Sequence, residues 1–597
     1  MSFMFNPFPY NDPNAVNHIA NDGSVDLGRT AIGNAQVAAV LAKAIKPGTV
    51  VSIDGYATAP FNAVVALLPA NVRLISVASI YKTADELDAL FADYLPEDRE
   101  KDPVLLYGKL FKEGYKGIFD EAKLAALRKE LEAKGDVCTV IYGNGAASEP
   151  LADLVDTKIY VDVTPKKAVL NIKAGGYRNF GNDKDLPFKV TMRRCYYVDF
   201  ELGFSLRCKL LANNDLDYYI CADDPTNLKI LPGDVLHALV SRTLDYPIRQ
   251  RPVYLEGVWG GYLTMKERNL PKEMKNCAWV FDMIPMEVST VVIMDGKEFE
   301  FPYYVLVAAE GKKLMGQKCL DEFHGFFPIR FNYDDTFHSS GNMSIQLHPD
   351  ADFVVPNHNE LGRQDESYYI VQTAQRARTY LGFNRGADPE EFIAEVKRSE
   401  KDHKPVDYQK YIYSVESKPG IQVMIPAGTI HGSGKNQLIL EIGSLTVGSY
   451  TYKMYDYLRK DLDGNPRPIH TYFGNINLKR EMTQDYVEKN LVNGGYRVVR
   501  ENGDAKEVVV GECDKLYFSL RNLIFGDYMD DNTNGDFHVL SLVDGEDVTV
   551  RSKKDPSLKF DMKYLDIVVV PADFGEYEII NNKPETWTTI HKTLLKR

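Results

Sequence analysis

The sequence predicts a multidomain protein in which an α/β domain is followed by two all-β jelly rolls, the first with a helical insertion. Three observations support this fold class. Helix-like and strand-like segments alternate through the first 240 residues. Strand-like segments separated by Gly, Asp and Asn turns dominate from residue 241 onward, and one amphipathic segment interrupts them. We therefore expect domains at residues 1–240, 241–500 and 501–597.

The α/β domain is expected to begin with an irregular arm, residues 1–26, that packs on larger structure. Helical periodicity follows at three places, and buried strand patterns lie between and after them. The expected helices are 32–45, 84–94 and 122–134, and the expected strands are 49–53, 137–142 and 158–162. This order is the βαβ pattern of an α/β domain.

The loop after the first of these strands, Gly55–Asn62, occupies the place where a P-loop nucleotide kinase carries Gly-x-x-x-x-Gly-Lys-Ser/Thr. Here the second glycine is Pro60, the lysine is Phe61 and the hydroxyl residue is Asn62. The groups that contact the phosphates and Mg²⁺ are thus missing, and we expect no ATP-dependent kinase activity. Residues 156–163 and Arg193–Asp199 resemble the uridine-kinase-like branch of P-loop proteins, which implies a degenerate uridine-kinase-like domain.

The first jelly roll is expected to contain strands at 289–293 and 298–305 as well as strands that carry candidate metal ligands. The helical insertion is predicted at Asp388–Lys397, because a proline stands at its first helical position and acidic residues follow in the first turn. We expect this helix to interrupt the succession of strands.

Four residues of the first jelly roll are candidate metal ligands: Gln346, His348, Glu366 and His431. Side chains alternate along a strand, so Gln346 and His348 share one face. Glu366 opens a second strand, and His431 follows a Pro-Ala-Gly turn. A single histidine is usually a core or surface residue, but two imidazoles, a carboxylate and an amide oxygen together suit one divalent ion. Zn²⁺ is favoured, with Mn²⁺, Co²⁺ or Fe²⁺ as alternatives.

The motifs around these ligands resemble the class I mannose-6-phosphate isomerases. They are Asn342–Pro349, Glu366–Ile370, Ile425–His431, Leu438–Gly443 and Thr451–Asp456, with Gly257–Gly261 and Phe326–Arg330 upstream. The resemblance implies a metal-dependent cupin that interconverts mannose 6-phosphate and fructose 6-phosphate through an enediol, with a small phosphosugar as its substrate. The alternative is a metal-containing phosphosugar-binding or sensor protein without catalytic activity.

Two positions depart from the family pattern. Lys453 stands where many members have an active-site arginine, and Gln364 stands where many have a lysine. We expect Lys453 to be catalytic, although lysine lacks the bidentate fork of arginine. Arg459 and Arg467 are the candidates for binding the substrate phosphate. The general base is left open among Asp365, Lys453 and Asp456.

The C-terminal segment predicts an accessory jelly roll, with strands at 514–520, 537–543 and 565–572. Its two histidines, His538 and His591, have no partners at ligand spacing. We therefore expect both to be structural or surface residues.

Composition limits the partners and the compartment. A net charge of −14 and a pI near 5.4 argue against nucleic acid or an anionic membrane as the main partner. The seven cysteines are odd in number and form no Cys-x-x-Cys pair, which favours a reducing compartment. We find no signal peptide pattern and no apolar run of membrane-spanning length. A cytoplasmic protein is expected, and its oligomeric state is left open.

Overall fold

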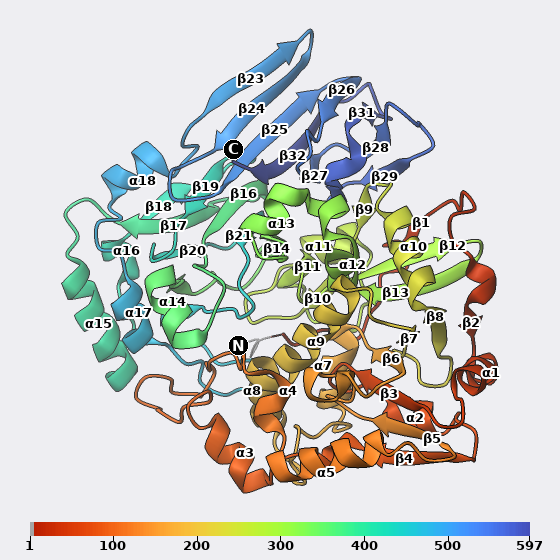
Figure 1. The fold of residues 1–597 in the computed structure, drawn as a ribbon. Coiled ribbons are helices and arrows are strands. Elements are labelled where there is room, and N and C mark those ends of the chain that lie inside the picture. The colour runs from red at the N-terminus through yellow and green to blue at the C-terminus, as the bar shows by residue number, and fades with distance from the viewer. Residues whose placement is uncertain (1–4, 597) are drawn as a thin grey trace.

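The α/β part of the protein is built on a seven-stranded sheet, as the computed structural model of residues 5–596 shows (Figure 1). Its strand order is β2-β8-β7-β6-β3-β5-β4, in which β4, β5, β3, β6 and β7 are parallel. The strands are β2 (Ala31–Ile32), β3 (Val50–Gly55), β4 (Val72–Ser76), β5 (Cys138–Tyr142), β6 (Thr157–Asp162), β7 (Tyr218–Cys221) and β8 (Lys229–Pro232).

Helices supply the crossovers that parallel strands require. The longer ones are α1 (Asn34–Ala44), α3 (Ala84–Phe91), α5 (Glu121–Glu132), α7 (Pro165–Lys173), α8 (Phe188–Arg194), α9 (Phe200–Ala212) and α10 (Gly233–Thr243). Between α8 and α9 the chain forms a π-helical turn, Cys195–Asp199. The predicted helices at 32–45, 84–94 and 122–134 are α1, α3 and α5, with ends that differ by at most three residues.

The N-terminal arm is tied to the middle of the chain. Its strand β1 (Asn17–His18) pairs in parallel with β12 (Ser289–Met294), which pairs with β13 (Lys297–Pro302). The prediction that 289–293 and 298–305 belong to the jelly roll was therefore wrong, because these strands form a separate sheet with the arm. The second strand also ends at Pro302, since α12 (Tyr303–Met315) begins directly after it.

Two antiparallel sheets form the first jelly roll, at the centre of Figure 1. One has the order β10-β11-β14-β21-β16-β19 and the other β18-β17-β20-β15-β22. The first contains β10 (Val253–Leu255), β11 (Trp279–Met283), β14 (Ile329–Asp335), β16 (Glu366–Thr373), β19 (Gln422–Ile425) and β21 (Gln437–Ser444). The second contains β15 (Ile345–Leu347), β17 (Arg378–Phe383), β18 (Ile412–Glu416), β20 (His431–Ser433) and β22 (Tyr452–Tyr455).

The predicted helical insertion is α15 (Pro389–Asp402), which is longer than expected. Its N-cap, Asp388, accepts a hydrogen bond from the amide of Glu390 at 2.9 Å. Further helices of this part are α14 (Ala351–His358), α17 (Thr471–Asn477) and α18 (Gln484–Asn490).

The C-terminal jelly roll lies on the opposite side of the central sheets from the α/β part (Figure 1, blue). Its larger sheet has the order β23-β24-β25-β32-β27-β30-β9, and the smaller one β26-β31-β28-β29. The larger contains β23 (Arg497–Asn502), β24 (Ala505–Gly511), β25 (Phe518–Phe525), β27 (His538–Asp544), β30 (Ile567–Val570) and β32 (Thr588–Leu595). The smaller contains β26 (Tyr528–Asn532), β28 (Asp547–Ser552), β29 (Lys559–Lys563) and β31 (Glu576–Asn581).

The edge strand β9 (Ile248–Arg249) comes from the connector that follows the α/β part. This connector is therefore a strand of the C-terminal sheet rather than a free linker. The division at residues 240 and 500 stays a prediction. No helix among residues 5–596 is both long and apolar enough to cross a lipid bilayer.

Candidate metal centre

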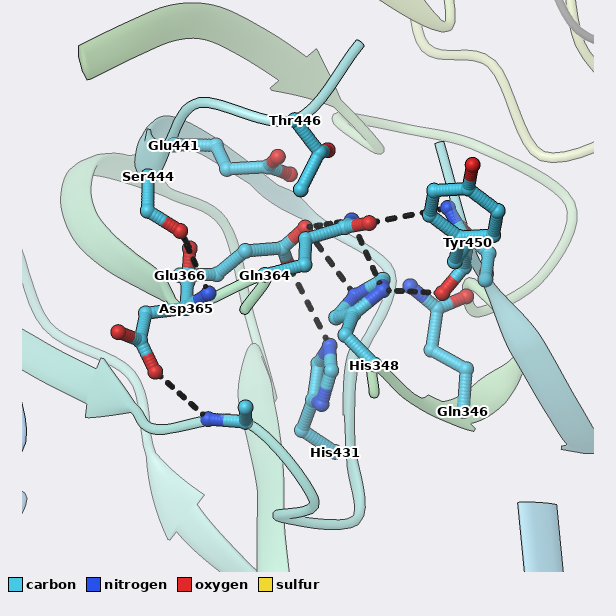
Figure 2. Close-up of polar contacts among 12 residues, drawn as sticks. Gln346, His348, Gln364, Asp365, Glu366, His431, Glu441, Ser444, Thr446 and Tyr450 are labelled. Atoms are coloured by element: carbon cyan, nitrogen blue, oxygen red, sulfur yellow. Dashed lines mark hydrogen bonds and ion pairs between the residues drawn. The ribbon is translucent and has the colours of Figure 1, made fainter. Parts of the chain in front are cut away.

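Three of the four predicted ligands converge at one buried point between the two sheets of the first jelly roll (Figure 2). Candidate ligand atoms of His348, Glu366 and His431 lie within 4.8 Å of one another. The His348 Nε2 atom is 3.1 Å from Glu366 Oε1, and His431 Nε2 is 3.4 Å from Glu366 Oε2. The convergence of the three side chains follows from their places at the ends of strands. His348 follows β15, Glu366 is the first residue of β16 and His431 is the first residue of β20.

The ligand-bearing atoms lack ordinary hydrogen-bond partners. His348 Nε2, His431 Nε2 and Glu366 Oε2 are buried and make no hydrogen bond to any described residue. Leaving buried polar atoms unsatisfied is costly, and a cation would satisfy all three at once. Two nitrogen donors and a carboxylate match the ligand preferences of Zn²⁺ and its neighbours. The residues present therefore fit a divalent metal ion.

Backbone carbonyls orient both imidazoles. The Nδ1 atom of His348 lies 3.0 Å from the carbonyl oxygen of Tyr450, and Nδ1 of His431 lies 2.9 Å from that of Thr429. A carbonyl oxygen can only accept, so Nδ1 of His431 carries the proton and its Nε2 lone pair is free for a metal. Nδ1 of His348 also lies 2.9 Å from the side-chain nitrogen of Gln364, so two groups hold this ring in place. This arrangement is the usual support of a metal-bound histidine.

Electrostatics keep the carboxylate ionised. Burial alone would raise the pKa of Glu366, but the two histidines and Arg330 hold that pKa well below its usual range. Arg330 donates to Glu366 Oε1 at 2.8 Å. An ionised carboxylate is the form that binds a cation.

The fourth predicted ligand, Gln346, stands at the same cavity as His348 and Glu366. Its amide oxygen accepts a hydrogen bond from the Ser344 hydroxyl at 2.7 Å. In Figure 2 its side chain lies beside His348 rather than between the two histidines. Its role as a ligand stays a prediction.

The cavity beside the three converging residues has a volume of about 140 Å³. Besides Arg330, which is paired with Glu366, two cationic side chains line it. Lys453, on β22, is buried with no hydrogen-bond partner for Nζ among the described residues. Burial and the nearby Arg467 lower the pKa of Lys453 to about 8. Arg467 donates to Asp456 Oδ2 at 2.6 Å. An anionic substrate group entering here would meet both cations.

The two arginines predicted to bind phosphate differ in position. Arg467 lines the cavity, whereas Arg459 does not belong to its wall. The Arg459 guanidinium instead donates to Asp456 and, at 2.6 Å, to the carbonyl oxygen of Asn342. The structure therefore favours Arg467 and Lys453 over Arg459 as contacts for phosphate.

Two of the three candidate bases are already engaged. Asp365 accepts from the amide of Ala427 at 2.9 Å and pairs with Arg363. Asp456 is surrounded by Lys453, Arg459 and Arg467, which together hold its pKa at about 2 despite burial. Neither aspartate lines the cavity.

Sequence reasoning missed two carboxyls that do line the cavity, Glu287 and Glu441. Burial raises the pKa of Glu287 to about 7, against the opposing effect of Arg330. Glu441 lies within the motif Leu438–Gly443 on β21, and burial with neighbouring Glu366 and Asp334 raises its pKa well above the usual range. Glu287 had no sequence signal, because it stands in a turn between β11 and β12.

Residues from the α/β part also form the cavity wall. They are Leu106, Tyr107 and Tyr196, joined by Phe5 of the arm. No sequence pattern marked these residues. The cavity is therefore enclosed by segments from two regions far apart in the chain.

At the carboxyl end of β3, directly before the loop that departs from the P-loop pattern, the buried Asp54 side chain binds backbone amides. Asp54 accepts hydrogen bonds from the amides of Gly55 at 2.7 Å, Gly145 at 3.1 Å and Ala147 at 2.7 Å. Burial raises the pKa of this carboxyl to about 7. Clustered backbone amides of this kind often bind anionic ligands, and here they donate to the Asp54 side chain instead.

Comparisons with known proteins find a family match for residues 33–245 and relatives that cover up to about half of the chain. A family described as a domain of unknown function (DUF8485) matches residues 33–245. Mannose-6-phosphate isomerase ManA of Bacillus subtilis is 25% identical over 336 residues, which cover 56% of this chain and 95% of that protein. Mannose-6-phosphate isomerase of Streptococcus mutans is 27% identical over 226 residues, covering 37% of this chain and 65% of that protein.

Among solved structures, the mannose 6-phosphate isomerase of Bacillus subtilis matches with a TM-score of 0.46 and 18% identity, over 58% of this chain and 99% of that one. The resemblance to mannose-6-phosphate isomerases that the motifs indicated is confirmed by the sequence relatives. The resemblance of the N-terminal part to uridine kinases stays a prediction.

Proposed function

We propose that this protein is a metal-dependent aldose–ketose isomerase that interconverts mannose 6-phosphate and fructose 6-phosphate. The observation that carries the proposal is the buried His348–Glu366–His431 cluster beside a cavity that also contains Lys453 and Arg467. The similarity to mannose-6-phosphate isomerases over more than half of the chain supports the same activity. We propose Zn²⁺ as the metal, with Gln346 as a fourth ligand.

The reaction moves a proton between C1 and C2 of the sugar through an enediol. A bound divalent ion would polarise the carbonyl group and stabilise the negative charge that develops on its oxygen. Lys453 is placed to add a charged donor for that oxygen, because its Nζ is buried at the cavity without a hydrogen bond. Arg467 is our candidate for holding the phosphate group, since a guanidinium suits phosphate geometry.

The proton itself requires a base with a pKa near the working pH. Glu287 is our candidate, because it lines the cavity and its pKa is raised to about 7. Glu441 is the second candidate. It lines the same cavity, and burial together with Glu366 and Asp334 raises its pKa well above the usual range.

A coupled assay of mannose 6-phosphate turnover tests the proposed activity. The metal-loaded wild type should convert the substrate, and His431→Ala should not. Absence of turnover by a fully loaded wild type would leave the alternative, a phosphosugar-binding or sensor protein without catalytic activity. Unchanged turnover in His431→Ala would refute the metal site.

For the N-terminal part we propose a degenerate uridine-kinase-like fold without ATP-dependent activity. The parallel strand order supports this proposal, as do the hydrogen bonds that Asp54 accepts from the amides of Gly55, Gly145 and Ala147. We propose a cytoplasmic protein that acts on a small phosphosugar and has neither nucleic acid nor membrane as its main partner. The acidic net charge of −14 supports this.

A further inference from the structure

The α/β part, to which no function is assigned, contacts the loop that borders the metal cavity. We name residues 445–451, between β21 and β22, the pocket loop. Five of its residues line the cavity, namely Thr446, Val447, Gly448, Ser449 and Thr451. Tyr107 and Tyr196 line the same cavity from the other side.

Tyr107 contacts the end of the pocket loop directly. Its hydroxyl donates to the carbonyl oxygen of Thr451 at 2.6 Å. Its ring stacks on Tyr450 with centroids 5.9 Å apart, and meets Tyr452 edge-on at 5.2 Å. Its side chain therefore fixes both the backbone and the rings of residues 450–452.

The residues that Tyr107 holds support the metal centre. The Tyr450 carbonyl oxygen lies 3.0 Å from Nδ1 of His348 and so helps to hold the imidazole ring whose Nε2 atom faces Glu366. Thr451 directly precedes β22, the strand that carries Lys453. A shift of this backbone would move a predicted ligand and a predicted catalytic group together.

Tyr196 holds the other end of the pocket loop. It belongs to the π-helical turn between α8 and α9, a feature often found at functional sites. Its hydroxyl donates to the carbonyl oxygen of Val447 at 3.1 Å. The Glu360 carboxylate binds the amides of Val447 at 2.9 Å and Gly448 at 2.5 Å from the jelly-roll side.

Buried hydrogen bonds within the α/β part hold the backbone around Tyr107 in place. The Asp102 carboxylate accepts from the amides of Leu106 at 2.5 Å and Tyr107 at 2.7 Å. The buried Arg193 guanidinium donates to the Tyr107 carbonyl oxygen at 2.5 Å and to that of Pro96 at 2.8 Å. These buried hydrogen bonds to the backbone on both sides of Tyr107 restrict its position.

We infer that Tyr107 and Tyr196 are positioning residues of the isomerase site, so that residues 33–245 serve as one wall of the sugar pocket and hold its loop. The inference rests on the proposed function for its kinetic consequence. Its consequence for the metal centre does not depend on which reaction takes place.

The experiment compares Tyr107→Phe, Tyr107→Ala, Tyr196→Phe and the double phenylalanine variant with the wild type in the full-length chain. The matched control is Tyr81→Phe, because the Tyr81 hydroxyl donates to a backbone carbonyl, that of Asn144, at 2.7 Å and lies away from the cavity. The first readout is Co²⁺ affinity by chelator competition, together with the visible spectrum of the Co²⁺-loaded protein. The second is kcat and KM for mannose 6-phosphate.

We expect Tyr107→Ala to weaken Co²⁺ binding roughly tenfold and to change the spectrum, as loss of an outer support of a metal ligand does. The double phenylalanine variant should lower kcat/KM roughly tenfold at saturating metal, since small misplacements are costly. Tyr81→Phe should stay within about twofold of the wild type in both readouts, because it leaves this support intact.

Wild-type Co²⁺ affinity and spectrum in Tyr107→Ala would overturn the inference, and so would equal losses in Tyr81→Phe, which would indicate a general packing effect. If the wild type does not turn over mannose 6-phosphate, the proposed function fails while the Co²⁺ readouts still decide the inference.

Discussion

The Nδ1 atom of His348 lies 3.0 Å from the carbonyl oxygen of Tyr450, so a residue of the pocket loop orients one of the predicted metal ligands. The amide of Tyr450 in turn donates to the Gln364 side chain at 2.9 Å. Gln364 also donates to Glu366 Oε1 at 3.2 Å. The buried Gln364 side chain thus contributes to ordering the candidate metal centre.

The first prediction concerns metal content. The wild type should carry close to one divalent ion per chain, and His348→Ala or His431→Ala should lose it, because each removes one of three converging donors. His338→Ala, at an exposed histidine, is the control. Elemental analysis of the purified proteins measures the outcome, and full occupancy in both ligand variants would exclude this site.

The second prediction concerns Lys453. Lys453→Ala should lower kcat and kcat/KM together by roughly a hundredfold, as the loss of one donor to the transition state does. Lys453→Arg should preserve activity, and Lys435→Ala, at an exposed lysine, should have no effect. A rise in KM alone would instead identify Lys453 as a phosphate contact. Steady-state kinetics at equal metal content give the answer.

The third prediction distinguishes the two cavity carboxyls. Glu287→Gln should lower kcat roughly a hundredfold or more with metal retained, the usual loss when a general base is removed. In the wild type, kcat should rise with pH through about 7, because the ionised carboxylate is the active form. Should Glu441→Gln instead cause the larger loss and Glu287→Gln almost none, the base would be Glu441.

The fourth prediction concerns acid stability and His591. Nε2 of this buried histidine donates to the side-chain oxygen of Gln422 of the first jelly roll at 3.0 Å, and burial lowers the pKa of His591 to about 3. Unfolding would return the pKa to about 6.5, so the unfolded state binds the extra proton. The contribution of the neutral His591 side chain to the free energy of unfolding is complete above pH 6.5. It falls by about 1.4 kcal/mol per pH unit as the pH drops toward 3.

Denaturant unfolding of the wild type and His591→Gln at pH 7 and pH 5 measures this effect. The variant should be less stable at pH 7 but should lose about 2 kcal/mol less on acidification to pH 5. His338→Gln serves as the exposed control. Identical pH dependence in His591→Gln and the wild type would contradict the shifted pKa.

The fifth prediction is that Mg-ATP does not bind productively at Gly55–Asn62. Asp54 already takes the amides of Gly55, Gly145 and Ala147, and Pro60 has no amide hydrogen to offer. Calorimetric titration should show no binding heat, whereas mannose 6-phosphate should bind. Saturable Mg-ATP binding that Asp54→Asn abolishes would refute this view.

The sequence by itself determined the features that depend on neighbouring residues. Side-chain alternation placed Gln346 and His348 on one face of a strand, and both line the cavity. The cap Asp388 with Pro389 marked the start of α15 correctly. The sequence alone shows that Phe61 and Asn62 stand where a P-loop has its lysine and its hydroxyl residue. These signals are local because hydrogen bonding and periodicity within an element span only a few residues.

Only the tertiary structure decided which side chains surround the cavity. It placed Arg467 and Glu287 in the cavity wall and left Arg459 outside it. It also paired β1 with β12 across more than 270 residues of chain. It also set Tyr107 against Thr451, 344 positions away. Such contacts leave no pattern in either segment, because packing at a junction depends on how whole elements assemble. Each residue alone is compatible with many environments.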